Sequence, residues 1–374
     1  MNRVVLASVA VAALAGASVL GWFEVRQARD FRRLLAVGDA ALTRDQTSAA
    51  IEAFSGAIAL RRDSMLGWLK RGDTYRRRGD FSSALRDLEQ AARLDPDAPR
   101  PMELLGDVNA ALGHHTKAID YYSRFVAIDD RAQRVFYKLA LAYYRSGHPS
   151  AALEPVRRAI GLDRQFTEAY YLLGLCERET QRLDEAAAAF RRVLAVNPTF
   201  LPAREELAAL DSARGRRRDS IEQLEALAAL EPGPGRLIDV AEAYARAGRI
   251  DSAVLTLARA ADRYPASANV YLSLARFWLN VAEEQADAIA VSKASNAVKA
   301  AAARDTQAPE LPLLRGRAEL LTGDLTAAER SFQTATATLP VEPSAFRYLA
   351  EAAERLGHRD VAQIARARYL ALAQ

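Results

Sequence analysis

Apolar and small residues recur along the chain at a fixed interval of 34 residues. The clearest copy comprises Trp68, Leu69, Gly72, Tyr75, Gly79, Ala84, Leu88, Ala91 and Pro96. Residues of the same classes return one interval later from Met102, two intervals later from Phe136 and three intervals later from Tyr170. A pattern that repeats at this length is typical of a chain built from stacked copies of one small unit.

Each position of the repeat has a physical task in a helix–turn–helix unit. Gly or Ala at the eighth position and Ala at the twentieth let two helices approach closely, and large residues at the fourth, eleventh and twenty-fourth fill the surrounding space. Gly at the fifteenth position is expected to end the first helix in a left-handed turn, at Gly79, Gly113, Gly147, Gly215, Gly248, Gly323 and Gly357. Pro near the thirty-second position stops the second helix, at Pro96, Pro198, Pro232, Pro265 and Pro340.

This pattern resembles that of the tetratricopeptide-repeat (TPR) family, whose unit carries W-x2-L-G-x2-Y followed by Ala, Phe, Ala and Pro. The resemblance implies an all-α fold, a right-handed α-solenoid of about ten stacked helix–turn–helix repeats, preceded by one N-terminal apolar helix. We place the repeats with starts near residues 31, 65, 99, 133, 167, 201, 234, 268, 309 and 343. The sixth is weak because Ser220 replaces the packing Ala. The eighth holds about seven extra residues, which two added turns divided between its helices would absorb.

The first 30 residues are predicted to form a separate segment, an N-terminal transmembrane anchor or signal peptide with a short basic juxtamembrane part, before the solenoid at 31–374. Residues 4–23 carry no charge, and at 1.5 Å per residue they reach the ~30 Å that a membrane-spanning helix needs. Ala13, Ala15 and Ala17 offer cleavage sites of a signal peptide. We favour the anchor because apolar residues continue past both sites, and a cleaved signal stays open as the alternative.

This segment sets the predicted localisation. A single N-terminal span would anchor the chain in a membrane, most simply a bacterial inner membrane. The arginines that follow it, Arg26, Arg29, Arg32 and Arg33, favour the cytoplasmic side slightly by the positive-inside rule. Export, with a periplasmic or secreted solenoid after signal cleavage, is the alternative.

Composition and charge exclude several classes of function. The 51 Lys and Arg are interleaved with 47 Asp and Glu, without a basic stripe, so no nucleic-acid partner is expected. Cys176 is the only cysteine, and the four histidines fall beside glycines that end helices. No CxxC, HExxH or phosphate-loop motif is present. We therefore predict no catalytic residue, metal site or cofactor, and a protein that is not an enzyme.

The family resemblance also implies a binding surface. In TPR proteins the concave groove is lined by the first helix of each unit, chiefly at positions 2, 5, 9, 12 and 13. Carried onto this chain, the predicted partner-binding groove comprises Arg76, Arg77, Arg100, Asp107, Arg134, Tyr137, Leu141, Tyr144, Arg145, Tyr171 and Arg178. Tyrosine offers apolar area with a polar tip, and Arg can grip carboxylates. Packing of these tyrosines against the next helix is the alternative for each of them.

We therefore predict a membrane-tethered scaffold that binds partner proteins or peptides in the TPR groove and serves the assembly or regulation of a bacterial envelope or secretion complex. A non-catalytic accessory subunit of an enzyme complex and a glycan-binding periplasmic solenoid are the alternatives. The sequence leaves the identity of the partner and the oligomeric state open.

Overall fold

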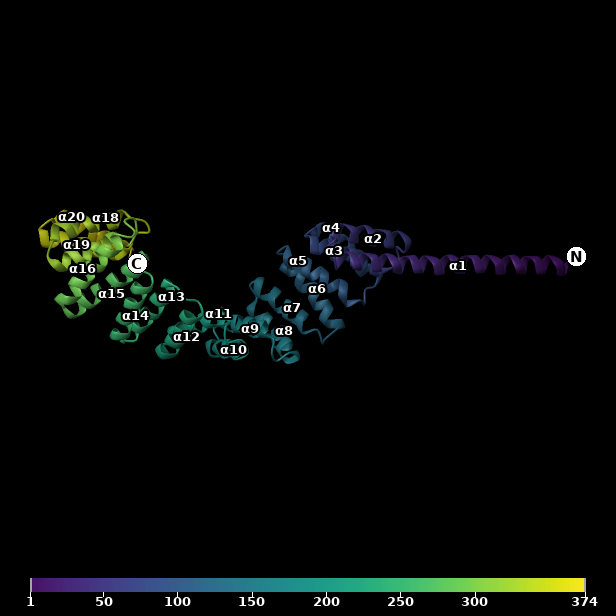
Figure 1. Ribbon diagram of the computed structural model, residues 1–374, viewed down its shortest axis with the longest axis horizontal. Coiled ribbons are helices and arrows are strands. Elements are labelled where there is room, and N and C mark those ends of the chain that lie inside the picture. The colour runs from purple at the N-terminus through teal and green to yellow at the C-terminus, as the bar shows by residue number, and fades with distance from the viewer. Residues whose placement is uncertain (1, 373–374) are drawn as a thin grey trace. The chain divides into compact units, whose positions relative to one another are not determined.

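The computed structural model describes the backbone of residues 2–372 and the side chains of residues 21–372. This described part folds into twenty α-helices and contains no strand, as the all-α prediction requires (Figure 1). The chain forms two compact units, Met1–Pro198 and Thr199–Gln374, which we call unit 1 and unit 2.

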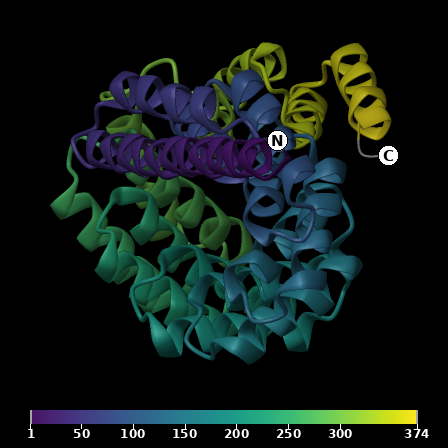
Figure 2. The same ribbon diagram turned by 90° about the vertical axis from the view of Figure 1, so that its right-hand side faces the viewer.

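Unit 1 consists of five helical hairpins. Each odd-numbered helix packs on the even-numbered helix that follows it, and that even helix packs on the next hairpin. In Figure 2, α1 is drawn in purple and lies beside α2. The helices are α1 (Asn2–Leu42), α2 (Thr47–Leu60), α3 (Met65–Arg78), α4 (Phe81–Leu94), α5 (Pro99–Ala111), α6 (His115–Ile128), α7 (Gln133–Arg145), α8 (Pro149–Leu162), α9 (Thr167–Glu179) and α10 (Leu183–Val196).

Unit 2 repeats the same arrangement with five more hairpins, which pack on one another in chain order. Its helices are α11 (Leu201–Ala213), α12 (Arg217–Leu230), α13 (Pro234–Arg246), α14 (Ile250–Arg263), α15 (Ala268–Gln285), α16 (Ala288–Ala302), α17 (Leu311–Thr322), α18 (Leu325–Ala337), α19 (Pro343–Leu356) and α20 (Arg359–Leu372). The handedness of the solenoid and the domain division at residue 30 stay predictions.

Close helix contacts in both units depend on residues without a side chain. A Cβ atom added to Gly174 of α9 would stand 2.5 Å from the ring of Phe190 on α10, and one added to Gly316 of α17 would stand 2.6 Å from the ring of Phe332 on α18. Both rings are fully buried. The expected pairing of a small eighth residue with a large twenty-fourth residue is therefore confirmed at these positions, where any larger residue would separate the helices.

The turns between paired helices also follow the sequence. All seven predicted glycines adopt a left-handed backbone, with φ between 70° and 85°. Where the repeat lacks this Gly, Asp45, Gln181 and Ala286 take up positive φ instead. Because the left-handed region is costly for residues that carry a Cβ, glycine is the residue that this turn favours.

The two irregular repeats keep the fold by local adjustments. The buried hydroxyl of Ser220 donates a hydrogen bond of 2.9 Å to the carbonyl oxygen of Ala208, so the polar replacement of the packing Ala is satisfied. Most of the insertion in the eighth repeat lengthens α15, which has 18 residues, whereas α16 has 15. The expected division of the extra residues between the two helices is thus uneven. The Asp287 carboxylate then caps α16 by accepting a bond from the Ile289 amide.

The prediction of a separate N-terminal apolar helix that spans a membrane is wrong. Within the described part of the chain, no helix combines the length and the apolar character that crossing a bilayer requires. Residues 4–23 are continuous with the first repeat in the single helix α1, which from residue 21 onward carries Glu24, Arg26 and Arg29, charges that hydrocarbon disfavours. The side chains of residues 2–20 lie outside the described residues. The membrane-anchored localisation that we predicted from this span is corrected accordingly.

Candidate partner-binding grooves

The predicted groove residues lie on four consecutive odd-numbered helices of unit 1. Helix α3 contacts α5, α7 contacts α9, and Lys138 of α7 pairs with Glu103 of α5, so these helices form a common surface. We call it the α3–α9 groove after the predicted groove. It carries Arg76 and Arg77 on α3, Arg100 and Asp107 on α5, Arg134, Tyr137, Leu141, Tyr144 and Arg145 on α7, and Tyr171 and Arg178 on α9. That these residues bind a partner stays a prediction.

On α3, the groove cations are paired with a neighbouring carboxylate. Asp73 accepts contacts of 2.7 Å from Arg76 and 3.1 Å from Arg77, one helical turn away. Such pairs on a partly exposed helix face contribute a few tenths of a kcal/mol each. Their main effect is to reduce the positive charge that α3 would offer a ligand.

Lys138 of α7 ties α7 to α5 through two acidic side chains. Its ammonium lies 2.7 Å from Glu103 and 2.8 Å from Asp107, and Arg100 lies 2.5 Å from Glu103. Burial alone would raise the pKa of Glu103, but Lys138 and Arg100 hold that pKa below its usual value. Asp107 also accepts a bond of 2.8 Å from the Tyr122 hydroxyl, so both carboxylates are engaged within the protein.

The aromatic residues of α7 and α9 are half-buried. The ring of Tyr137 packs against Phe166 at a centroid distance of 5.0 Å, and Tyr171 packs against Phe190 at 5.7 Å. Burial, and then the charge of Glu168, raise the pKa of Tyr137. Leu141 and Tyr144 pack on the same core cluster. These side chains are therefore anchored in the core on one side, which keeps them in place and leaves part of each accessible.

The two arginines at the ends of α7 differ from the other groove cations. Arg134 and Arg145 are exposed, and neither forms an ion pair within 4.0 Å among the residues that the structure describes. Arg178 of α9, by contrast, lies 2.7 Å from Glu179. The α7 face thus offers a half-buried apolar strip with one cation at each end.

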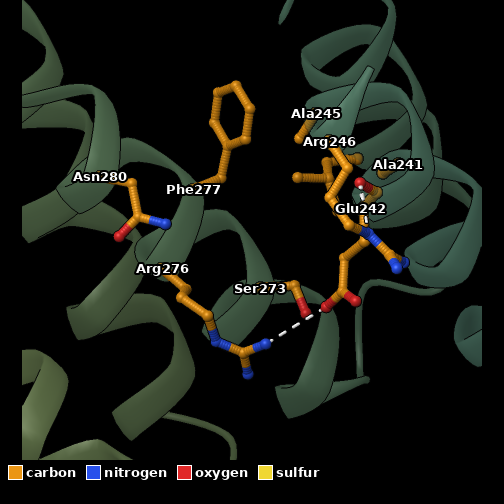
Figure 3. Close-up of a pocket in the computed structure, with 9 residues that line it drawn as sticks. Ala241, Glu242, Ala245, Arg246, Ser273, Arg276, Phe277 and Asn280 are labelled. Atoms are coloured by element: carbon orange, nitrogen blue, oxygen red, sulfur yellow. Dashed lines mark hydrogen bonds and ion pairs between the residues drawn. The ribbon is translucent and has the colours of Figure 1, made fainter. Parts of the chain in front are cut away.

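Unit 2 contains a pocket between the corresponding helices α13 and α15 (Figure 3). Its volume is about 290 Å³. Figure 3 shows Phe277 of α15 facing Ala245 and Arg246 of α13 across the opening, with Arg276 paired to Glu242 below them. The lining residues are Ala241, Glu242, Ala245, Arg246, Leu257, Ser273, Arg276, Phe277 and Asn280.

Arg276 also lines a second pocket of about 450 Å³, formed mainly by residues of α17 and of the segments before α17 and α19. The guanidinium of Arg276 lies 3.2 Å from Glu242 of α13 and 2.6 Å from Glu310, the residue before α17. All three side chains are about half-exposed, so their pairing is weak and open to competition by a ligand.

A second, more buried ionic cluster reaches this pocket through Arg317. The buried guanidinium of Arg317 on α17 lies 2.9 Å from Glu283 and donates a bond of 2.8 Å to Asn280, both on α15. The Tyr348 hydroxyl of α19 donates to Glu283 at 3.1 Å. Glu283 belongs to the residues by which α15 is longer than the other odd helices of unit 2, so the insertion supplies a carboxylate that links three successive repeats.

Sequence reasoning missed the pocket between α13 and α15, although the signal was present. Glu242, Ala245 and Arg246 occupy positions 9, 12 and 13 of the seventh repeat, counted from residue 234, and Arg276 and Asn280 occupy positions 9 and 13 of the eighth, counted from 268. The same rule that selected residues in unit 1 therefore selects five of the nine lining residues here. Phe277 lies outside the rule, at position 10.

The single cysteine offers no reactive group. Cys176 is fully buried on α9, and burial raises the pKa of its thiol to about 12. A thiol with this pKa is protonated at neutral pH and is a poor nucleophile. Among the described residues, no group of three His, Cys, Asp or Glu side chains is placed to hold a metal ion.

Comparison with known protein families identifies the repeats. One tetratricopeptide-repeat model matches residues 69–132, 137–199 and 313–367, and a second matches residues 239–267, so that together they cover more than half of the chain. The chain belongs to the tetratricopeptide-repeat family. Repeats of this family typically form non-catalytic scaffolds for protein interaction, and no catalytic family matches.

Solved structures of similar repeat proteins match parts of the chain. MamA is 26% identical and matches with a TM-score of 0.42 over 43% of this chain and 94% of its own. YrrB, described as a TPR protein with an unusual peptide-binding site, is 23% identical with a TM-score of 0.46 over 49% of this chain and 94% of its own. A repeat protein from Parabacteroides merdae is 16% identical with a TM-score of 0.47 over 63% and 93%. No curated protein sequence matches the chain.

Proposed function

We propose that the protein is a non-catalytic scaffold that holds partner proteins by binding their peptide segments on its odd-numbered helices. The observation that carries this proposal is the pocket between α13 and α15. It combines apolar lining at Phe277, Leu257 and Ala245 with charged groups at its edge, and a site of this kind is suited to hold an apolar side chain and orient the chain around it.

The α3–α9 groove supports the same function in unit 1. Its half-buried tyrosines lose little side-chain entropy on binding because Phe166 and Phe190 already hold Tyr137 and Tyr171. Aromatic and Arg side chains are the residue types that contribute most at protein interfaces. The predicted role in an envelope or secretion complex depended on the membrane span and is not carried forward. Neither an accessory-subunit role nor glycan binding is favoured by a specific contact of the described residues.

The proposal is tested by partner capture with the full chain as bait in an extract of its native cells. We expect Phe277→Ala to reduce the captured partner about tenfold, because an aromatic anchor in a pocket contributes about 1.4 kcal/mol or more. The matched control is Ile289→Ala on α16, which removes a side chain that is 65% exposed and lies outside the pocket. Equal capture by the two variants would show that the pocket does not bind partners.

A further inference from the structure

The exposed face of α7 has an ordered pattern of cations and apolar groups. Arg134, Tyr137, Leu141 and Arg145 follow one another at steps of three, four and four residues, so they lie along one side of the helix. Tyr137 and Leu141 are half-buried in the middle, and the two arginines are exposed at the ends. The face is therefore an apolar strip with a positive charge at each end.

These two charges are distinct from the other cations of the α3–α9 groove because, among the described residues, no carboxylate lies within 4.0 Å of either guanidinium group. Arg76 and Arg77 share Asp73, and Lys138 and Arg100 contact Glu103. Glu168 of α9 acts on the phenol of Tyr137, but it forms no ion pair with Arg134 or Arg145. Both guanidinium groups thus keep their N–H donors available for an external ligand.

We propose that the α7 face binds an acidic linear segment of a partner protein, with two carboxylates that flank apolar side chains. Arg134 and Arg145 are eleven positions apart, which corresponds to about 16 Å along a helix. An extended peptide covers this distance in about five residues. Because its side chains alternate in direction, two acidic residues that face α7 stand about four or six positions apart. The apolar residues between them lie on Tyr137 and Leu141. This inference rests on the proposed function, because it names the chemistry of one partner segment.

Charge decides between this occupant and others. A guanidinium binds a carboxylate through two parallel hydrogen bonds, so each end of the strip fixes one acidic side chain in position. A basic segment would bring like charges together at both ends, and a neutral one would leave both guanidinium groups without a partner. Only an acidic segment would form favourable contacts both with the apolar strip and with the two arginines.

The test is selection of binding peptides from a random dodecapeptide display library on the full chain. The same selection is run on the double variant Arg134→Glu with Arg145→Glu, and on the control Arg131→Glu with Arg164→Glu. The control arginines are exposed in inter-repeat turns and form no ion pair among the described residues, so the two variants carry the same net charge. Circular dichroism verifies that all three proteins are folded.

We expect the wild type and the control to enrich peptides with two acidic residues about four or six positions apart around apolar residues. The α7 double variant should retain these peptides at least about tenfold less. Enrichment of neutral or basic peptides, or equal retention by the α7 double variant, would overturn the inference. The enriched peptides are also tested on the folded Phe277→Ala variant of the proposed function. If they lose binding to this variant but not to the α7 double variant, the inference is wrong while the proposed function stands. If no peptide is enriched at all, both are wrong.

Discussion

The odd-numbered helices of units 1 and 2 use the same repeat positions for different purposes. In unit 1, position 9 is Asp107 on α5 but Leu141 on α7, so the charges gather beside α5 and an apolar strip lies open on α7. In unit 2, Glu242 and Arg276 both occupy position 9, and the resulting ionic chain continues to Glu310 beside a pocket. One scaffold therefore presents two surfaces of different chemistry, which is expected if each unit holds a different partner segment.

The largest effect on stability should come from the close contact between a glycine and a buried ring, which both units share. Gly174→Val in unit 1 and Gly316→Val in unit 2 each place a side chain against a buried ring, and each should lower the stability of its unit by about 3 kcal/mol. Urea unfolding measures this loss. Gly161→Ala in α8, where no atom lies within 4 Å of the added Cβ, should instead increase stability by about 0.5 kcal/mol. Unchanged stability of Gly174→Val would disprove the close helix contact.

The ionic clusters of the two units should differ in strength. Arg317→Met leaves Glu283 without its buried partner and should cost about 2 kcal/mol, whereas Lys138→Met should cost about 1 kcal/mol because the Lys138 side chain is 29% exposed and that of Arg317 only 10%. Thermal unfolding of the two variants shows which substitution causes the larger loss of stability. The reverse order would mean that the cluster provided by the insertion is not the stronger of the two.

Two acidic side chains, Glu103 in unit 1 and Asp239 in unit 2, should make contributions to stability that change in opposite directions with pH. The pKa of Glu103 in unit 1 is lowered, so its contribution to stability is complete above the ordinary Glu value of 4.5 and is lost as pH falls through the lowered value. Burial raises the pKa of Asp239 in unit 2, so its contribution is complete below the ordinary Asp value of 3.8 and is lost as pH rises through the raised value.

Stability curves of Glu103→Gln and Asp239→Asn between pH 3 and pH 7 separate these cases. At pH 7 the first variant should be less stable than the wild type and the second equally or more stable, and both differences should shrink in acid. Each effect should stay below about 1 kcal/mol because both groups are partly solvated. If both variants shifted stability in the same direction at pH 7, the assigned signs would be wrong.

The smallest effect on stability is expected at Arg276. Its side chain is 40% exposed and its partners are about half-exposed, so Arg276→Ala should change the unfolding free energy by less than about 0.5 kcal/mol. Chemical denaturation checks this value. A loss above 2 kcal/mol would show that Arg276 is part of the core and that its ion pairs beside the two pockets are not weak and displaceable.

The repeat pattern predicted the helices and turns well because their causes are local. A glycine with positive φ, a proline beyond a helix end and a small residue opposite a large one act within a single hairpin, as Gly79, Pro96 and Gly174 illustrate. The repeat rule selects five residues that line the pocket between α13 and α15, but the space between them depends on how two neighbouring repeats lie side by side. The link from Glu283 to Arg317 needed the insertion to lengthen α15 by the right amount, which the sequence did not show.

The membrane span shows the limit of reasoning from composition alone. A run of uncharged residues predicted an independent helix at 4–23, whereas the structure continues the same segment into the helix that carries the buried Phe31 and Leu35 of the first repeat. The C-terminal part of this helix packs on α2. The uncharged run therefore marked a change along one helix and did not mark the boundary of a separate one.

The most direct test of the central claim is site-specific photo-crosslinking of the full chain in its native cells. A photoreactive phenylalanine analogue is placed at Tyr137 or at Phe277 on the odd-numbered helices, and at Arg158 or at Ile289 on the even-numbered helices as controls. We predict discrete covalent adducts with partner proteins from the first two positions and none from the controls. Adducts only from the even-numbered helices, or equal yields at all four positions, would contradict the claim that the odd-numbered helices hold the partners.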